Sequence, residues 1–337
     1  MSFRTCLFCA IAVAWLAGAA GAGEPRPGAF DRGDNALWMR RHWLHEGPSK
    51  EEIAALVASL RERGIKRIYP FLGPMDKDGW PGWRSKAGHV RYVPERAAAF
   101  FAEFHQAAPE IRIIPWSGGN LNQDVHLDDA AQRRAFADQA RKLVELGADG
   151  VQLNVEPMPS ASLAYIELLR TVKAAIGPRT LSVAAYPPPA RSELDLYTHW
   201  DLQFMRAVCG IANELAVMSY DTGLTSAAEY EKQLSIWTRS LARTLPAPEA
   251  GGCEWLMGVS AYDDDKDYHR PDVETVEHSL IGIVGGLSGL APPSNFRGVA
   301  VYASFTADER KWALYSRLWR GREPPVSPPP DPRNTTE

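Results

Sequence analysis

Cysteine is scarce in this chain. There are four, and Cys6 and Cys9 fall in the apolar first twenty residues, which leaves Cys209 and Cys253. Without a cluster of His and Cys ligands, a structural zinc site is not expected. Two states stay open for the remaining pair, a disulfide in an oxidising compartment and two buried free thiols.

Basic residues do not outnumber acidic ones in this chain, and long apolar runs are also lacking. The net charge of -4 excludes the electropositive surface that nucleic acid needs. An apolar run over 6–20, ending in Ala20-Gly21-Ala22, predicts a secretory signal peptide over 1–22, too short to span a membrane. We therefore expect a secreted or periplasmic protein, without a membrane span after signal removal, and a monomer.

The rest of the chain lacks internal repeats and shows the spacing of βα units. Eight strand-like runs recur along it, separated by amphipathic helices of which 50–63, opened by the capping box Ser49-x-x-Glu52, is the clearest. They are 36–43, 66–72, 111–116, 150–156, 180–186, 214–220, 255–262 and 298–304. The pattern predicts a single (β/α)₈ TIM barrel over 30–321, followed by a Pro-rich disordered tail over 322–337.

One predicted strand, 150–156, ends in a carboxylic acid. Gln152, Asn154 and Glu156 share one face by period-2 alternation, and Pro157 stops the strand. Polar residues pointing into a barrel are costly unless something needs them. The carboxyl ends of barrel strands hold catalytic groups, so Glu156 is a catalytic candidate. For Gln152 a structural hydrogen-bonding role is favoured.

The strand resembles the Asp-x-x-Asp-x-Asp-x-Glu motif of glycoside hydrolase family 18, with Asp149 and Glu156 at its first and last positions. Gln152 and Asn154 replace the two middle aspartates. Asn two residues before Glu is similar to the Asn-x-Glu motif of family 85 endo-β-N-acetylglucosaminidases. Both families are (β/α)₈ barrels that use the substrate's own N-acetyl group as nucleophile.

A second stretch resembles family 18. Met218-Ser219-Tyr220-Asp221 is similar to its Met-x-Tyr-Asp motif, whose Tyr hydroxyl helps to bind the acetamido group. At the end of the last strand, Tyr302 stands where family 18 usually has a Trp beneath the sugar. Further candidates for substrate binding at this rim are Gln152, Asp221, Trp116, Tyr186 and Tyr262.

The resemblance implies a mechanism. Glu156 would protonate the glycosidic oxygen while the 2-acetamido carbonyl attacks the anomeric carbon. Asn154 would hold the acetamide nitrogen and Tyr220 the acetamide oxygen. Burial would raise the pKa of Glu156 and keep it protonated. The substrate is then an N-acetylhexosamine-containing glycan, and neither a cofactor nor a metal is expected.

Three alternatives remain open. Glu156 could be paired with a basic side chain and merely brace the barrel. The chain could be a two-carboxylate glycosidase, since Asn154-Val155-Glu156-Pro157 is similar to the Asn-Glu-Pro motif of other barrel glycosidases, with Asp221 or Asp263 as nucleophile. It could also be a glycan-binding barrel without catalysis. The acidic run after 262 is interpreted as a solvated loop.

Overall fold

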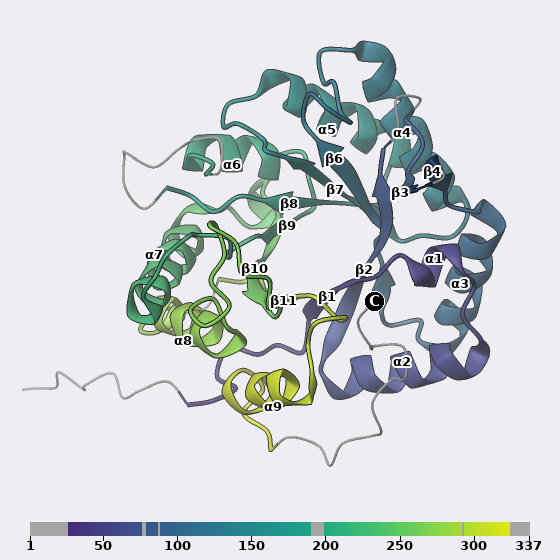
Figure 1. Cartoon of the computed structure of the whole chain (residues 1–337). Helices are drawn as coiled ribbons and strands as arrows, with labels where there is room; N and C mark the ends of the chain where they lie inside the picture. The colour runs from purple at the N-terminus through teal and green to yellow at the C-terminus, as the bar shows by residue number, and fades with distance from the viewer. Residues whose placement is uncertain (1–25, 76–78, 87, 190–198, 292, 324–337) are drawn as a thin grey trace, which may run out of the picture.

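The computed structural model describes residues 26–75, 79–86, 88–189, 199–291 and 293–323. The predicted signal peptide lies outside these ranges, as does the predicted tail from residue 324 onward. Between the first and last elements, the described chain alternates strands and helices (Figure 1).

The strands form a closed parallel barrel of eight strands, in which the short strands β5 and β6 together make up the third. In chain order they are β1 (Asn35–Met39), β2 (Ile65–Pro74), β5 (Arg112–Ile113), β6 (Trp116–Asn120), β7 (Gly150–Glu156), β8 (Thr180–Ala185), β9 (Glu214–Val217), β10 (Glu254–Ser260) and β11 (Phe296–Tyr302). The barrel closes because β1 pairs with both β2 and β11. The predicted TIM barrel is confirmed.

Helices surround the barrel, as Figure 1 shows. They are α1 (His42–His45), α2 (Lys50–Glu62), α3 (Pro94–Ala107), α4 (Ala130–Glu145), α5 (Leu163–Ile176), α6 (Leu202–Cys209), α7 (Ala227–Thr244), α8 (Val276–Leu287) and α9 (Glu309–Leu318). The predicted capping box at α2 is present, with Ser49 and Glu52 each accepting from the other's backbone. None of the described helices is long and apolar enough to cross a membrane.

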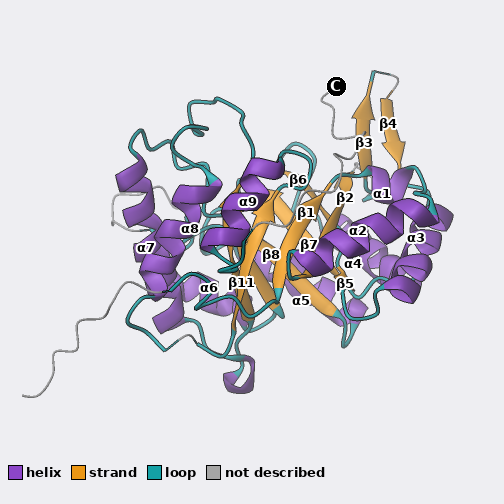
Figure 2. Cartoon of the chain, turned by 90° about the horizontal axis from the view of Figure 1, so that it is seen from below, coloured by secondary structure: helices purple, strands orange, loops and turns teal. Residues whose placement is uncertain are grey.

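Most of the predicted strands differ from the observed strands by a few residues at their ends, whereas the strand 150–156 has the predicted limits. The first ends at Met39, because His42 and Trp43 already belong to α1. The third consists of β5 and β6, which both pair with β2 on either side of Pro115, a residue without a backbone N–H for the ladder. The sixth ends at Val217, three residues earlier than expected. A hairpin of β3 (Gly82–Ser85) and β4 (Gly88–Arg91) projects from the barrel after β2 (Figure 2).

Cys209 and Cys253 form a disulfide, which decides between the two states left open by the sequence. Their Cα atoms are 5.0 Å apart and 44 residues separate them in the chain. The bond ties the end of α6 to the residue before β10, at the end of the barrel where strands begin.

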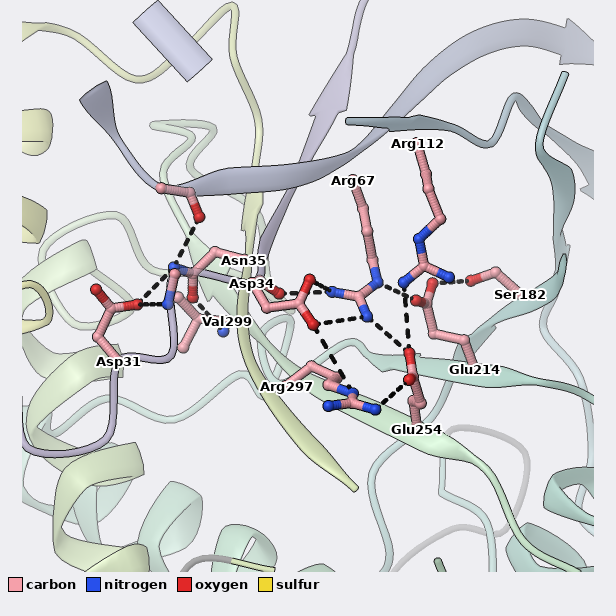
Figure 3. A network of polar contacts seen from close by, with 12 residues as sticks. Asp31, Asp34, Asn35, Arg67, Arg112, Ser182, Glu214, Glu254, Arg297 and Val299 are labelled. Carbon is pink, nitrogen blue, oxygen red and sulfur yellow. Dashed lines mark hydrogen bonds and ion pairs between the residues drawn. The ribbon is translucent and has the colours of Figure 1, made fainter. Parts of the chain in front are cut away.

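At that same end, a buried arginine neutralises a cluster of acids inside the barrel (Figure 3). Arg67 of β2 is fully buried and forms ion pairs with Glu214 of β9 at 2.6 Å and with Glu254 of β10 at 2.7 Å. It also pairs with Asp34, just before β1, and Glu254 pairs in addition with Arg297 of β11. Four barrel strands are therefore joined by charge at their amino ends.

Polar contacts continue upward from this cluster. Glu214 accepts hydrogen bonds from Tyr69 at 2.6 Å and from Ser182 at 2.8 Å. Ser182 accepts one from Gln152 at 3.0 Å, and Gln152 accepts one from Trp38 at 2.7 Å. Buried polar atoms inside the barrel are thus paired with one another along a continuous chain.

We predict that Arg67→Met strongly destabilises the fold. Removing one partner of a buried ion pair leaves uncompensated charge, which costs about 3–5 kcal/mol. Denaturant unfolding at pH 7 measures this, with Arg61→Met as the control, because Arg61 pairs with Glu110 on the exposed surface. An Arg67→Met protein as stable as the control would show that the cluster is dispensable.

Candidate active site

The strand β7 presents its polar face to the barrel interior, as its alternation predicted. Val151, Leu153 and Val155 are buried in the main hydrophobic core, on the opposite face of the strand. Along the inner face burial decreases toward the carboxyl end: Gln152 is fully buried, whereas Asn154 and Glu156 are half-buried. Glu156 therefore ends the strand at the rim of the barrel, where the residue is partly exposed.

Gln152 lies below the rim. Its amide oxygen accepts from Trp38 and its amide nitrogen donates to Ser182, so both ends of the side chain are used inside the barrel. These contacts match the structural role favoured from the sequence. We therefore leave Gln152 out of the proposed substrate contacts.

The side chains of Asn154 and Glu156 are hydrogen-bonded to each other. Asn154 Nδ2 donates to Glu156 Oε2 at 2.9 Å, and the Tyr186 hydroxyl donates to Glu156 Oε1 at 3.3 Å. Asn154 Oδ1 is buried and has no hydrogen-bond partner among the described residues. An unpaired buried acceptor costs about 1–3 kcal/mol, so a hydrogen bond to this oxygen would be favourable.

Burial raises the pKa of Glu156. The negative charge of Asp221 raises it further, and the hydrogen bonds from Asn154 and Tyr186 oppose these effects. Among the described residues, no Arg, Lys or His forms an ion pair with Glu156, which argues against a bracing role. A carboxylic acid held protonated above its usual pH range is suited to general acid catalysis.

Tyrosine rings gather beside Glu156. Tyr302, at the end of β11, stacks on Tyr220 with centroids 5.4 Å apart, and Tyr262 meets both rings edge-on. Burial, followed by the charges of Glu156 and Asp221, raises the pKa of Tyr302 to about 12, so its hydroxyl keeps its proton. Ends of β7, β8, β9, β10 and β11 thus bring the predicted residues together.

Trp116 lies deeper than expected. It begins β6 in register with Gln152, stacks on Phe71 at 4.0 Å and stays half-buried. Further along the strand, Gly118 runs so close to β7 that a Cβ there would overlap the carbonyl oxygen of Asn154. Glycine at this position lets β6 approach the site residues closely.

A triad formed by Asp221 and the buried residues His269 and Glu274 was not predicted from the sequence. His269 and Glu274 come from the loop between β10 and α8, and both are fully buried against Asp221. No strand periodicity marks this loop, so only the polar burial reveals it. The bonded neighbours Asp221 and Glu274 raise the pKa of His269 to about 9 despite the desolvation that lowers it. One ligand atom from each of Asp221, His269 and Glu274 lies within 4.8 Å of the others, and we interpret the three side chains as an ionic cluster.

The acidic loop after Tyr262 fits its interpretation as solvated. Asp263 pairs with Lys311, and Asp265 pairs with Arg270, both as exposed carboxylates. Glu254, at the opposite end of the barrel, takes part in the Arg67 cluster.

Comparisons with known proteins are informative only at the level of structure. A scan against protein-family models found no match, and neither did a search of curated proteins. Among solved structures, a fungal endo-β-N-acetylglucosaminidase from glycosyl hydrolase family 18 aligns with a TM-score of 0.57 and 14% identity, over 86% of this chain and 98% of that one.

Two bacterial enzymes align in the same way. The spore cortex-lytic enzyme SleL of Bacillus megaterium has a TM-score of 0.56 at 12% identity, over 85% of this chain and 74% of that one. A chitinase from Chromobacterium violaceum has a TM-score of 0.51 at 15% identity, over 84% and 98%. At such identity the likeness shows a shared fold, which is the barrel fold of these glycoside hydrolases.

The raised pKa of Glu156 predicts how stability depends on pH. A carboxyl group with a higher pKa in the folded state holds more protons there, so stability falls as pH rises from the unfolded pKa through the folded pKa. Glu156→Gln should match the wild type in acid and become more stable than it above that window. Thermal unfolding from pH 4 to pH 8 measures this difference in stability. The control is Glu145→Gln, because Glu145 is an exposed residue at the end of α4. A wild type that is more stable than Glu156→Gln at pH 8 would contradict the assignment.

Proposed function

We propose that this protein is a glycoside hydrolase that cleaves an N-acetylhexosamine-containing glycan by substrate-assisted retaining hydrolysis. The observation that carries this proposal is the pairing of Asn154 with Glu156. One end of the Asn154 amide holds the acid, and the other end is a buried oxygen without a partner. The N–H of a 2-acetamido group is the kind of donor that this oxygen lacks.

In the first step, Glu156 donates its proton to the glycosidic oxygen. The bond from the anomeric carbon to that oxygen breaks, while the acetamide carbonyl oxygen bonds to the anomeric carbon and gives an oxazolinium ion. Asn154 Oδ1 accepts from the acetamide N–H, which becomes more acidic as positive charge develops. Tyr220, whose pKa is raised by burial, keeps its hydroxyl proton and holds the acetamide oxygen.

In the second step, the ionised Glu156 takes a proton from water, and the water oxygen attacks the anomeric carbon. The oxazolinium ring opens and restores the acetamide, with the starting configuration retained. Asn154 donates to Glu156 Oε2, so the other oxygen, Oε1, which also accepts from the Tyr186 hydroxyl, would carry the moving proton. A general acid and base of this kind contributes about 10² to 10⁴ in rate.

The two carboxylates that could serve as a nucleophile, Asp221 and Asp263, have other partners. Asp263 points to Lys311, and Asp221 lies against His269 and the Tyr262 hydroxyl. Half-buried rings of Trp116, Tyr186 and Tyr302 could pack on sugar faces. The named activities of the structural neighbours, an endo-β-N-acetylglucosaminidase and a chitinase among them, support the substrate class.

Export also belongs to this proposal. The apolar run at residues 6–20 has the composition of a signal peptide. The Cys209–Cys253 disulfide supports an oxidising compartment, because such bonds persist outside the reducing cytosol. We infer that the enzyme acts on extracellular or periplasmic glycans.

We predict that the wild type hydrolyses N-acetylglucosamine oligomers and that Glu156→Gln lowers kcat/KM on them by about 10² to 10⁴. Substrates in which a hydroxyl replaces the 2-acetamido group should not be cleaved, and a thiazoline analogue of N-acetylglucosamine should inhibit competitively. Glu145→Gln serves as the control and should keep full activity.

A different result would favour one of the alternatives. Cleavage of substrates without the acetamido group, together with a 2-deoxy-2-fluoro sugar trapped on Asp221 or Asp263, would establish the two-carboxylate mechanism. Binding of the oligomers without hydrolysis would identify a glycan-binding barrel. Mass spectrometry and product analysis separate these outcomes.

A further inference from the structure

His269 lies between two carboxylates at the edge of the proposed site. Its Nδ1 atom is 3.2 Å from Asp221 Oδ1 and 3.3 Å from Glu274 Oε2. On the other side of the ring, Nε2 lies 3.4 Å from the carbonyl oxygen of Tyr262. Two carboxylate oxygens thus lie within ion-pair distance of Nδ1, although neither is in hydrogen-bonding geometry with it, and the imidazolium form would place a positive charge between them.

The surroundings hold this ring in place. His269 is fully buried and stacks on the Tyr262 ring with centroids 3.9 Å apart. Glu274 is also fully buried and accepts from the backbone N–H groups of Asp221 at 2.6 Å and Thr222 at 3.0 Å. The Thr222 hydroxyl donates to it as well, at 2.9 Å. Glu274 therefore fixes the backbone after β9, and His269 faces the Asp221 side chain.

Asp221 has an unusual backbone conformation. Its φ is 62°, in the left-handed region that costs energy for a residue with a side chain. The two hydrogen bonds to Glu274 hold Asp221 and Thr222 in this turn. The Asp221 side chain is 40% exposed. Its negative charge raises the pKa of Glu156.

Charge balance explains why a cation is present. Two neighbouring carboxylates raise the pKa of one another, and a positive charge between them opposes this repulsion. The groups that face this place are Asp221 after β9, Tyr262 after β10, and His269 and Glu274 before α8, with Asp264 near Asp221. Among these, His269 is the one that can be positive.

We propose that His269 is a positioning residue for the hydrolysis: its imidazolium keeps Asp221 ionised beside Glu156, and the charge of Asp221 keeps the proton on Glu156. This inference rests on the proposed function for the role of Glu156. The electrostatic link from His269 through Asp221 to Glu156 can be measured without any substrate.

Three measurements test the proposal. In the wild type, His269 should titrate with a pKa of about 9, measured by ¹H–¹⁵N NMR. In His269→Asn, whose amide can still donate near Nδ1 but is neutral, the Asp221 carboxyl should titrate about one pH unit higher, or tenfold in proton affinity. His269→Lys, which restores the charge, should return it toward the wild-type value.

The control is His278→Asn, because His278 pairs with Glu231 on the helical layer away from the site. It should leave the Asp221 titration unchanged. Carboxylate signals are assigned with Asp221→Asn and Glu156→Gln, and thermal unfolding shows that each variant folds. A wild-type His269 that titrates at or below 6.5 overturns the proposal even where the variants fail to fold.

The pH profile gives the matching kinetic readout. In His269→Asn, Asp221 keeps its proton to higher pH, and where it is neutral Glu156 lacks the neighbouring negative charge and gives up its proton more readily. The basic limb of kcat/KM should therefore move to lower pH, and His269→Lys should move it back. An unchanged limb and an unchanged Asp221 titration would overturn the role of His269. A wild type without hydrolysis but with the expected titrations would instead refute the proposed function.

Discussion

The buried guanidinium of Arg67 is the constraint on which the barrel depends. It brings the amino ends of β1, β2, β9 and β10 together through Asp34, Glu214 and Glu254, and the guanidinium itself is fully buried. The pKa of Arg67 is raised because three acids outweigh the desolvation that lowers it. A cation in this position cannot be removed without leaving several acids unpaired. Hydrogen bonds from Glu214 through Ser182 to Gln152 connect this cluster with the strand β7 that ends at Glu156.

The two ends of the barrel use carboxylic acids in opposite ways. At the amino end, Arg67 and Arg297 lower the pKa of Glu254, so this acid is ionised and contributes to stability. At the carboxyl end, Glu156 is half-buried near another carboxylate, no cation among the described residues forms an ion pair with it, and its pKa is raised. Pairing at one end makes a structural group, and the lack of pairing at the other makes a reactive one. In our proposal, the positive charge of His269 compensates the negative charge of Asp221, whereas no cation compensates Glu156.

Much of this arrangement could be predicted from the sequence, because it depends on local patterns. The strand 150–156 was predicted at its observed limits, since period-2 alternation and a following proline are both local signals. The capping box at Ser49 is local in the same sense. The break at Pro115 in the third strand could have been inferred from the missing N–H of proline.

Long-range partners could not be predicted in the same way. Nothing local shows that Arg67 would meet Glu254, or that His269 would fold back onto Asp221, because these contacts depend on barrel closure and on a loop path. The pairing of Cys209 with Cys253 also needed the fold, which sets their Cα atoms 5.0 Å apart. For Gln152 the sequence favoured a structural role, and its neighbours Trp38 and Ser182 explain why.

The central claim is that Asn154 and Glu156 form a site for a sugar with a 2-acetamido group. A crystal structure of Glu156→Gln soaked with a tetramer of N-acetylglucosamine tests it most directly. We expect one acetamide nitrogen to lie about 2.7–3.2 Å from Asn154 Oδ1, with the glycosidic oxygen next to residue 156. A tetramer bound with every acetamide away from Asn154, or bound elsewhere on the barrel, would contradict it.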